Sequence, residues 1–359
     1  MIKMHYYNIK REGFIIELEK NNETEFLGEE GLSVTGQSRM EAAYGSGDGD
    51  ESLSASVAGS QIPKGGTIYQ QIYRPWRGTI NPRWSRNWAI FRHHLFGIFS
   101  KGHRAWGWPT RLALFAILLG SMSDLLMTML GGLIGADEMS RMFAPNRSNL
   151  YGHVLGFAPR NAFCFPIAAA LLIGGIISED RKYGTSAIYF SRPINRFDYT
   201  AMKYVSVAII LFLIIDGTLA MYYFGDIILN NEGWNYLIDT IPLFATAALA
   251  GLLLIFTYTS IGLCLSSVSK GKFFPAVALL GIFLGSKLIA FLVWLIFDRS
   301  VVYLLSPYDC VAHVAQTMMN INSTYSHPWS WSLVSVLVMN VVSLYIIASR
   351  VSSMEVTRE

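Results

Sequence analysis

Long apolar stretches separated by short polar ones dominate the chain from residue 111 onward. A membrane-spanning helix needs about 20 mainly apolar residues, because each residue adds about 1.5 Å and the hydrocarbon core is about 30 Å thick. Six stretches reach or approach this length: about Arg111 to Ile134, Asn161 to Ile177, Tyr204 to Phe224, Thr240 to Ser266, Phe274 to Phe297 and Ser330 to Ala348. None is long enough to hold two spans. The pattern predicts an all-α membrane protein with about six transmembrane helices.

Large apolar residues also recur just before the first span, at Trp84, Trp88, Phe91, Leu95 and Ile98. Their spacing of three or four residues places them on one face of a helix. A helix packed on a soluble core would show the same periodicity. The aromatic stripe, the basic opposite face and the nearby span favour an amphipathic helix that lies in the membrane interface.

The first 65 residues have a different character. Residues 5–27 alternate loosely between apolar and polar, which indicates a short strand or two. Residues 44–60 are rich in Gly, Ser and Asp, as flexible linkers are. The chain is therefore divided into a small N-terminal segment (1–43), a linker (44–65), a basic segment with the interfacial helix (66–110), a six-helix transmembrane domain (111–349) and a tail (350–359).

Lys and Arg are distributed unequally between the two sides of the predicted bundle. Cytoplasmic loops of membrane proteins carry an excess of these residues. With the N-terminus inside, the segment 74–111 and the loop 181–203 place most basic residues in the cytoplasm. The other side receives Arg141, Arg147, Arg160 and Arg299. This asymmetry predicts a multi-pass protein of the cytoplasmic membrane, surrounded by lipid, with both termini and the N-terminal segment in the cytoplasm.

The composition excludes several other classes of protein. Hydrophobic residues make up 52% of the chain and charged residues 15%, against about 25% charged in soluble domains. A net charge of +3 is too small to indicate a nucleic-acid partner. The three cysteines are widely spaced, and Cys310, His313 and His327 match no defined ligand spacing, so no metal site is predicted.

Three ionisable residues fall near the middle of predicted spans, namely Asp124, Asp216 and Lys287. A charge at that depth costs about 2.5–3.5 kcal/mol on insertion scales, so it normally faces a partner or a wet cavity. The residues either form a structural ion pair, for which Asp216 with Lys287 is the preferred choice on depth, or line a path for substrate or protons.

Gly281 and Gly285 form a G-x-x-x-G pattern in the fifth predicted span. Small residues at this spacing let two helices approach closely. The pattern serves either a contact between subunits or ordinary packing within the chain.

The segment between the second and third spans is too long and too charged for a simple turn. Glu179, Asp180 and Arg181 end one helix, and Ser191-Arg192-Pro193 breaks the chain, because the residue before proline disfavours helix. Asn195 can then cap a helix that runs into the third span. The pattern predicts a short helix held between two spans, suited to receiving a mechanical push.

This segment resembles the corresponding loop of the permease subunits of type 2 ABC transporters. The matching residues are Glu179-Asp180-Arg181, Gly184, Ile188-Tyr189-Phe190, Ser191-Arg192-Pro193-Ile194, Arg196, Tyr199 and Lys203. Weaker likenesses lie at Tyr73 to Gly78 and at Arg350 to Val356. The resemblance extends from about Tyr69 to the C-terminus, and residues 1–60 depart from the family pattern.

The resemblance implies a transport subunit, commonly of an exporter, that is coupled to a separate ABC ATPase through this loop. The coupling residues it implies are Glu179, Asp180, Arg181, Gly184, Arg192, Pro193, Arg196 and Tyr199. It also implies a second permease copy, identical or related. The chain has no G-x-x-x-x-G-K-[ST] phosphate loop, so we expect it to be no enzyme and to bind no cofactor, with ATP and Mg²⁺ on the partner.

Two other classes of function remain as alternatives. A channel, an ion-coupled carrier or a membrane scaffold would also be a helical bundle, although an ion-coupled carrier should show inverted repeats. A membrane-embedded enzyme would need His or acidic clusters on its spans, and the predicted spans contain no His. Recovery of an ATPase with the chain would distinguish the permease from these alternatives.

Overall fold

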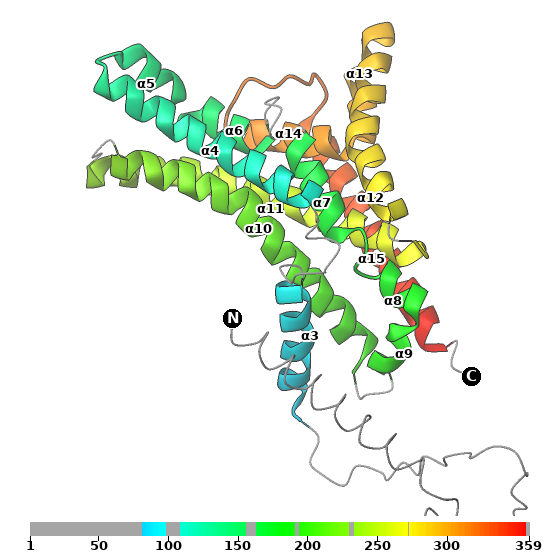
Figure 1. Cartoon of the computed structure of the whole chain (residues 1–359). Helices are drawn as coiled ribbons and strands as arrows, with labels where there is room; N and C mark the ends of the chain where they lie inside the picture. Colours follow the sequence, from blue (N-terminus) through cyan, green and yellow to red (C-terminus); the bar gives the residue numbers. More distant parts are fainter. Residues whose placement is uncertain are drawn as a thin grey trace, which may run out of the picture. The chain divides into compact units, whose positions relative to one another are not determined.

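The computed structural model describes residues 81–97, 108–155, 163–190, 194–229, 233–271 and 273–356. The chain divides into two compact units, Met1–Arg77 and Gly78–Glu359, and every described residue belongs to the second. The elements in these ranges are all helical (Figure 1). The predicted strands at 5–27, the linker at 44–65 and Ile98 lie outside the described residues.

The described helices are numbered in chain order. They are α3 (Arg83–Gly97), α4 (Trp108–Leu133), α5 (Asp137–Phe143), α6 (Arg147–Leu155), α7 (Phe165–Ile173), α8 (Ser178–Tyr183), α9 (Thr185–Phe190), α10 (Arg196–Leu229), α11 (Trp234–Val268), α12 (Phe273–Leu280), the π-helix η3 (Gly281–Gly285), α13 (Ser286–Phe297), the 3₁₀-helix η4 (Ser300–Leu305), α14 (Pro307–Met318) and α15 (Trp329–Val356).

Five of these helical stretches are long and apolar enough to cross a membrane. They are α4, α10, α11, the continuous stretch Phe273–Phe297 and the Trp329–Met354 part of α15. Each coincides with a stretch predicted from the hydrophobic pattern. The prediction of an all-α membrane protein is therefore confirmed.

The second predicted span, Asn161 to Ile177, differs from the expectation of a spanning helix. Its regular helix, α7, has 9 residues, which corresponds to about 14 Å and is too short to cross the hydrocarbon core. The chain turns at residues 174–177, at the pair Gly174-Gly175, before α8 begins. The described ranges therefore hold five helices of spanning length, not six, and α7 is a short buried helix that packs against α4, α11 and α12.

The two longest helices, α10 and α11, form the centre of the bundle, with 34 and 35 residues. They pack against each other, α10 also contacts α3 and α4, and α11 also contacts α14 and α15. Buried small residues such as Ala247, Ala250 and Gly251 on α11 allow this close packing. The core is therefore built around the α10–α11 pair.

Helix α14 lies in a segment that the hydrophobic pattern predicted as a loop. It has 12 residues, begins after Ser306, whose hydroxyl accepts a hydrogen bond from the amide of Asp309, and carries Pro307 in its first turn. Most of its residues are buried, and it packs against α11 and α15. The segment between the last two spanning stretches is therefore part of the core.

The fifth spanning stretch contains the predicted glycine pair within η3. The amide of Ser286 bonds to the carbonyl of Gly281, which is the wider spacing of a π-helix. A Cβ added at Gly281 or Gly285 would meet no atom of the described residues within 4 Å. The role of this pair stays a prediction. Figure 1 shows α12 and α13 at the edge of the bundle, and α13 exposes Leu288, Leu292 and Ile296.

Candidate functional site

The segment singled out in the sequence folds into two short helices, α8 and α9, which we call the α8–α9 hairpin. Gly184 separates them with a φ of 67°, a left-handed conformation that strains residues with a side chain. Helix α10 then begins at Arg196, directly after Asn195, as the sequence predicts. Arg192 and Pro193 lie outside the described residues.

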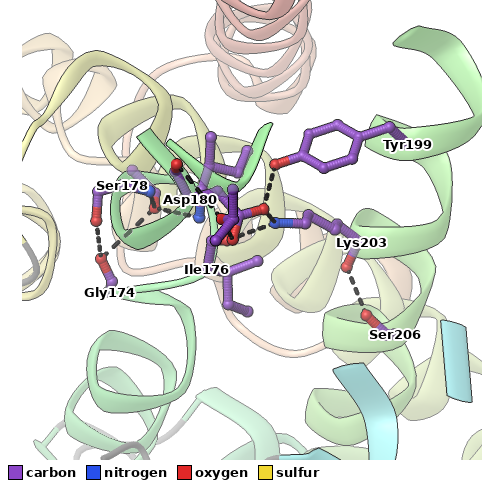
Figure 2. A network of polar contacts seen from close by, with 10 residues as sticks. Gly174, Ile176, Ser178, Asp180, Tyr199, Lys203 and Ser206 are labelled. Atoms are coloured by element: carbon purple, nitrogen blue, oxygen red, sulfur yellow. Dashed lines mark hydrogen bonds and ion pairs between the residues drawn. The ribbon is translucent and has the colours of Figure 1, made fainter. Parts of the chain in front are cut away.

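Asp180 is the centre of the polar network that joins the hairpin to α10 (Figure 2). Its Oδ2 accepts hydrogen bonds from Lys203 Nζ and from the hydroxyl of Tyr199, the latter at 2.7 Å. Its Oδ1 accepts a hydrogen bond from the Thr185 hydroxyl at 3.0 Å. The carboxylate therefore connects α8, α9 and α10.

Lys203 supplies the positive charge of this network. Its side chain is 0% exposed, and Nζ also donates to the carbonyl of Ile176 at 2.6 Å. The Tyr199 ring centroid lies 4.5 Å from the same nitrogen. A buried charge is costly unless it is paired and hydrogen-bonded, and this ammonium has both kinds of partner.

The network sets the charge of Asp180. Burial acts to raise the pKa of its carboxyl, but the Lys203 ammonium and the hydrogen bonds from Lys203, Tyr199 and Thr185 outweigh burial, so the pKa lies below its usual value. Asp180 is therefore held as a carboxylate, which keeps the hairpin attached to α10.

The hairpin is also bonded to the end of α11. Arg181 Nη1 donates to the carbonyls of Ser267 and Val268, at 2.7 and 3.1 Å. These carbonyls lie in the last turn of the helix, where they lack partners within α11 and attract a positive charge. The hydroxyl of Ser266 accepts hydrogen bonds from the amides of Ile177 and Ser178, at 3.0 and 3.1 Å. Ser266 thus caps the start of α8, whose preceding residue makes no side-chain cap.

Two further contacts bind the start of α10 to its neighbours. Arg83 of α3 forms a two-pronged ion pair with Asp198, with distances of 2.8 Å from Nε and 2.6 Å from Nη2. Arg196 Nη1 donates to the hydroxyl of Ser352 on α15 at 2.7 Å. Helices α10, α11 and α15 therefore meet around the hairpin, and α3 is bonded to the start of α10.

Comparison with known protein families shows which family this chain belongs to. The sequence model of the ABC-2 family transporter proteins matches residues 32–348, which include every helix from α3 to α14 and most of α15. The chain belongs to this family. A comparison with curated proteins found no match. The protein is thus a membrane-spanning permease subunit of an ABC transporter, as the loop motif indicated, and the family is one of transport subunits.

The permease brings together some of the predicted coupling residues and separates others. Asp180 and Tyr199 share one network, whereas Arg181 contacts α11 and Arg196 contacts α15. Glu179 packs over Gly175, where an added Cβ would lie 3.1 Å from its Cδ. These residues thus connect the hairpin to different parts of the bundle.

Several residues of the site were not predicted from the sequence. Lys203 was seen as part of the motif, but its burial as the counter-charge of Asp180 was not. Ser266, Asp198 and Arg83 carried no signal, because their partners are distant in the chain: 115 residues separate Arg83 from Asp198. A single Lys at the start of an apolar run was the one available clue to a buried ion pair.

The predicted stripe of α3 is divided between two environments. Phe91 is buried and Leu95 half-buried, whereas Trp84 and Trp88 are exposed and stack with ring centroids 5.9 Å apart. Ile90, beside the stripe, is also buried. The helix is confirmed, and its position in a membrane interface stays a prediction.

The expected ion pair between Asp216 and Lys287 is not formed, so this prediction is wrong. Lys287 Nζ lies 3.8 Å from Asp309 Oδ1 and 4.0 Å from the Tyr308 ring centroid, both on α14. The error arose because α14 was predicted as a loop. Asp124 faces His153 of α6, with 4.0 Å between Oδ2 and Nδ1, and this histidine is buried although its segment was also predicted as a loop.

A second polar cluster surrounds α14 at a distance from the hairpin. His313 and His327 lie 3.2 Å apart through Nδ1 and Nε2, and both contact the hydroxyl of Ser332. Burial, and for His313 also the neighbouring imidazole, lowers the pKa of each ring, to about 4 for His313. The two side chains therefore form a neutral hydrogen-bonded group that joins α14 to α15 and to the segment between them.

Proposed function

We propose that this permease is the membrane subunit of an exporter that is driven by ATP hydrolysis on a separate ABC ATPase. In this proposal two permease copies, identical or related, form the path and two ATPase subunits supply the work. ATP and Mg²⁺ are bound by the ATPase. The α8–α9 hairpin is the surface that the ATPase contacts, and it faces the cytoplasm together with both termini.

The observation that carries this proposal is the set of bonds between the hairpin and the bundle. Asp180 joins it to α10, Arg181 joins it to α11, and Arg196, at the start of α10, reaches α15. Each bond is charged or charge-assisted, and the Asp180 bond is largely shielded from water. A force applied to the hairpin is therefore passed directly to α10 and α11, and through Arg196 at the start of α10 to α15.

The hairpin and the first turn of α10 expose side chains that a partner protein could contact. Lys182 is exposed, and Tyr183, Ile188 and Phe197 are 60%, 60% and 73% exposed. Aromatic residues are enriched at the centres of protein interfaces, and charged residues such as Lys182 belong to the polar rim. In this proposal these side chains contact the ATPase, while the buried network behind them transmits its motion.

The test is recovery of the ATPase with tagged permease from native membranes. Lys182→Glu with Tyr183→Asp should lower the amount of co-purified ATPase at least about tenfold, since losing even 1.4 kcal/mol of binding energy has that effect. Both side chains are exposed, so the permease should remain folded.

The matched control is Arg141→Glu, which reverses an exposed positive charge on α5. This variant should recover as much ATPase as the unmodified chain. Equal recovery with the hairpin variant, or recovery of no ATPase with the unmodified chain, would contradict the proposal.

A further inference from the structure

Asp216 is a buried carboxyl that the proposed function does not use. It lies 20 residues after the start of α10 and 13 before its end (216 minus 196, and 229 minus 216), so it is about 30 and 20 Å from the two ends. It is 3% exposed. Asp216 is therefore in the middle of the longest apolar helix pair of the molecule.

Neither carboxyl oxygen of Asp216 has a hydrogen-bond partner among the described residues. The described part of the chain also places no ion pair on it, in contrast to Asp180, Asp198 and Asp309. An ionised carboxylate without a partner in an apolar interior costs far more free energy than a neutral carboxyl that lacks one hydrogen bond. The neutral, protonated form is favoured at this position.

The charged and titratable groups on the helices around α10 do not lie where they could neutralise a negative charge on Asp216. Asp124 of α4 and His153 of α6 pair with each other, and His153 contacts Thr218, which lies about 200° around the helix from Asp216. Tyr258 of α11 is seven residues beyond Gly251, or about 10 Å along the helix. Helix α7 carries no titratable residue. Arg83 of α3 pairs with Asp198 in the first turn of α10, and the neutral Ser352 of α15 accepts a hydrogen bond from Arg196 in the same turn.

The surroundings of the carboxyl leave little room for a larger ligand. Asp216 is packed against the backbone of Gly251, where an added Cβ would lie 2.0 Å from Oδ1. Glycine is required at this position because the carboxyl occupies the space of a side chain. A species that neutralises Asp216 in this packing must therefore be very small.

We propose that Asp216 is a proton-binding site of the permease, occupied while α10 and α11 are packed against Gly251 and emptied when these helices part. Separation of the helices would give the carboxyl access to water and allow it to ionise. That the proton is released during a transport cycle rests on the proposed function. That Asp216 binds a proton in the packed state does not.

The test uses the full chain alone in lipid nanodiscs with dicyclohexylcarbodiimide. This reagent adds to protonated carboxyls in apolar surroundings, first at oxygen and then by transfer of the acyl group to nitrogen, so that the whole reagent stays attached. Mass spectrometry should find the adduct on Asp216 at mildly acidic pH. The yield should then fall about tenfold for each pH unit above the pKa of the group.

Matched positions and variants make the labelling specific. Asp216→Asn should abolish the adduct on this peptide, Asp124→Asn should leave it unchanged, and Asp180, held as a carboxylate by Lys203, should not react. Labelling of Asp180 equal to that of Asp216 would overturn the proposal. So would a loss of labelling on addition of Na⁺ or K⁺ at constant pH, which would assign the site to a metal cation.

A second measurement covers the case in which the reagent cannot enter the packed bundle. A proton bound more tightly in the packed state than in the parted state makes packing less stable as pH rises. The thermal stability of the unmodified chain should therefore fall with rising pH relative to Asp216→Asn, which is neutral at every pH. The proposal would be overturned if Asp216 were not labelled and if the difference in thermal stability between the unmodified chain and Asp216→Asn did not change with pH. Neither measurement requires the ATPase, so failure here is separate from failure of the proposed function.

Discussion

Lys203 and Asp180 show how much of the site can be predicted from single residues. The motif placed Asp180 and Tyr199 in one functional segment, and the structure joins them through one carboxylate oxygen. The segment could not reveal that Lys203 is fully buried, because its burial depends on packing between helices. Asp216 was recognised as an unusual charge, but its true neighbour, Gly251, lies on another helix and has no side chain to indicate a contact.

The lowered pKa of Asp180 predicts a loss of stability in acid. A carboxyl whose folded pKa lies below its unfolded value stabilises the fold above the unfolded value, and this contribution is lost as pH falls through the folded pKa. Asp180→Asn leaves Lys203 buried without its counter-charge, so at neutral pH it should lower the free energy of unfolding by about 3–5 kcal/mol. The difference in stability between the unmodified chain and Asp180→Asn should become smaller as the pH falls.

Thermal unfolding of both proteins in nanodiscs, from neutral to acidic pH, measures this difference in stability. Asp239→Asn, a change at an exposed carboxyl, is the control and should alter stability little at any pH. A gap between Asp180→Asn and the unmodified chain that stays constant as pH falls would refute the stated role of Lys203.

At the scale of elements, the hydrophobic pattern predicted about six spans, of which five coincide with helices of spanning length, and two segments differ from the prediction. Helix α7 ends at Ile173 and the chain turns at residues 174–177, although the apolar run continues to Ile177. Helix α14 was missed because its 12 residues mix apolar and polar types and are shorter than any span. Its Asp309 contacts Lys287 and Tyr325 through Oδ1, and only the folded chain brings these residues together.

Ser266 tests the bond between α11 and the hairpin. Ser266→Ala removes the acceptor of two buried amides at the start of α8 and should cost about 1–3 kcal/mol. Hydrogen exchange at Ile177 and Ser178 should become faster while α11 stays protected. Ser123→Ala is the control, since that exposed hydroxyl bonds only within its own helix, to Gly120. Unchanged exchange at both amides would show that Ser266 does not hold α8.

At the scale of the whole molecule, the sequence was sufficient to identify the family. Membership rests on a match over residues 32–348 and agrees with the Ser-Arg-Pro loop and the apolar spans. The folded chain adds the reason why this loop suits a coupling role, since the α8–α9 hairpin is bonded to α10 and α11 and lies beside Arg196, which binds α15.

The account depends on the side of the membrane that the hairpin faces. Tyr183 on the hairpin and Arg141 on α5 are both exposed and belong to opposite predicted sides. The decisive measurement is labelling of Tyr183→Cys and Arg141→Cys in intact cells with a membrane-impermeant maleimide, with the parent chain as background for its three cysteines. The account predicts that Arg141→Cys reacts in intact cells and that Tyr183→Cys reacts only after permeabilisation. Labelling of Tyr183→Cys in intact cells would place the hairpin outside, beyond the reach of any ATPase, and would contradict the account.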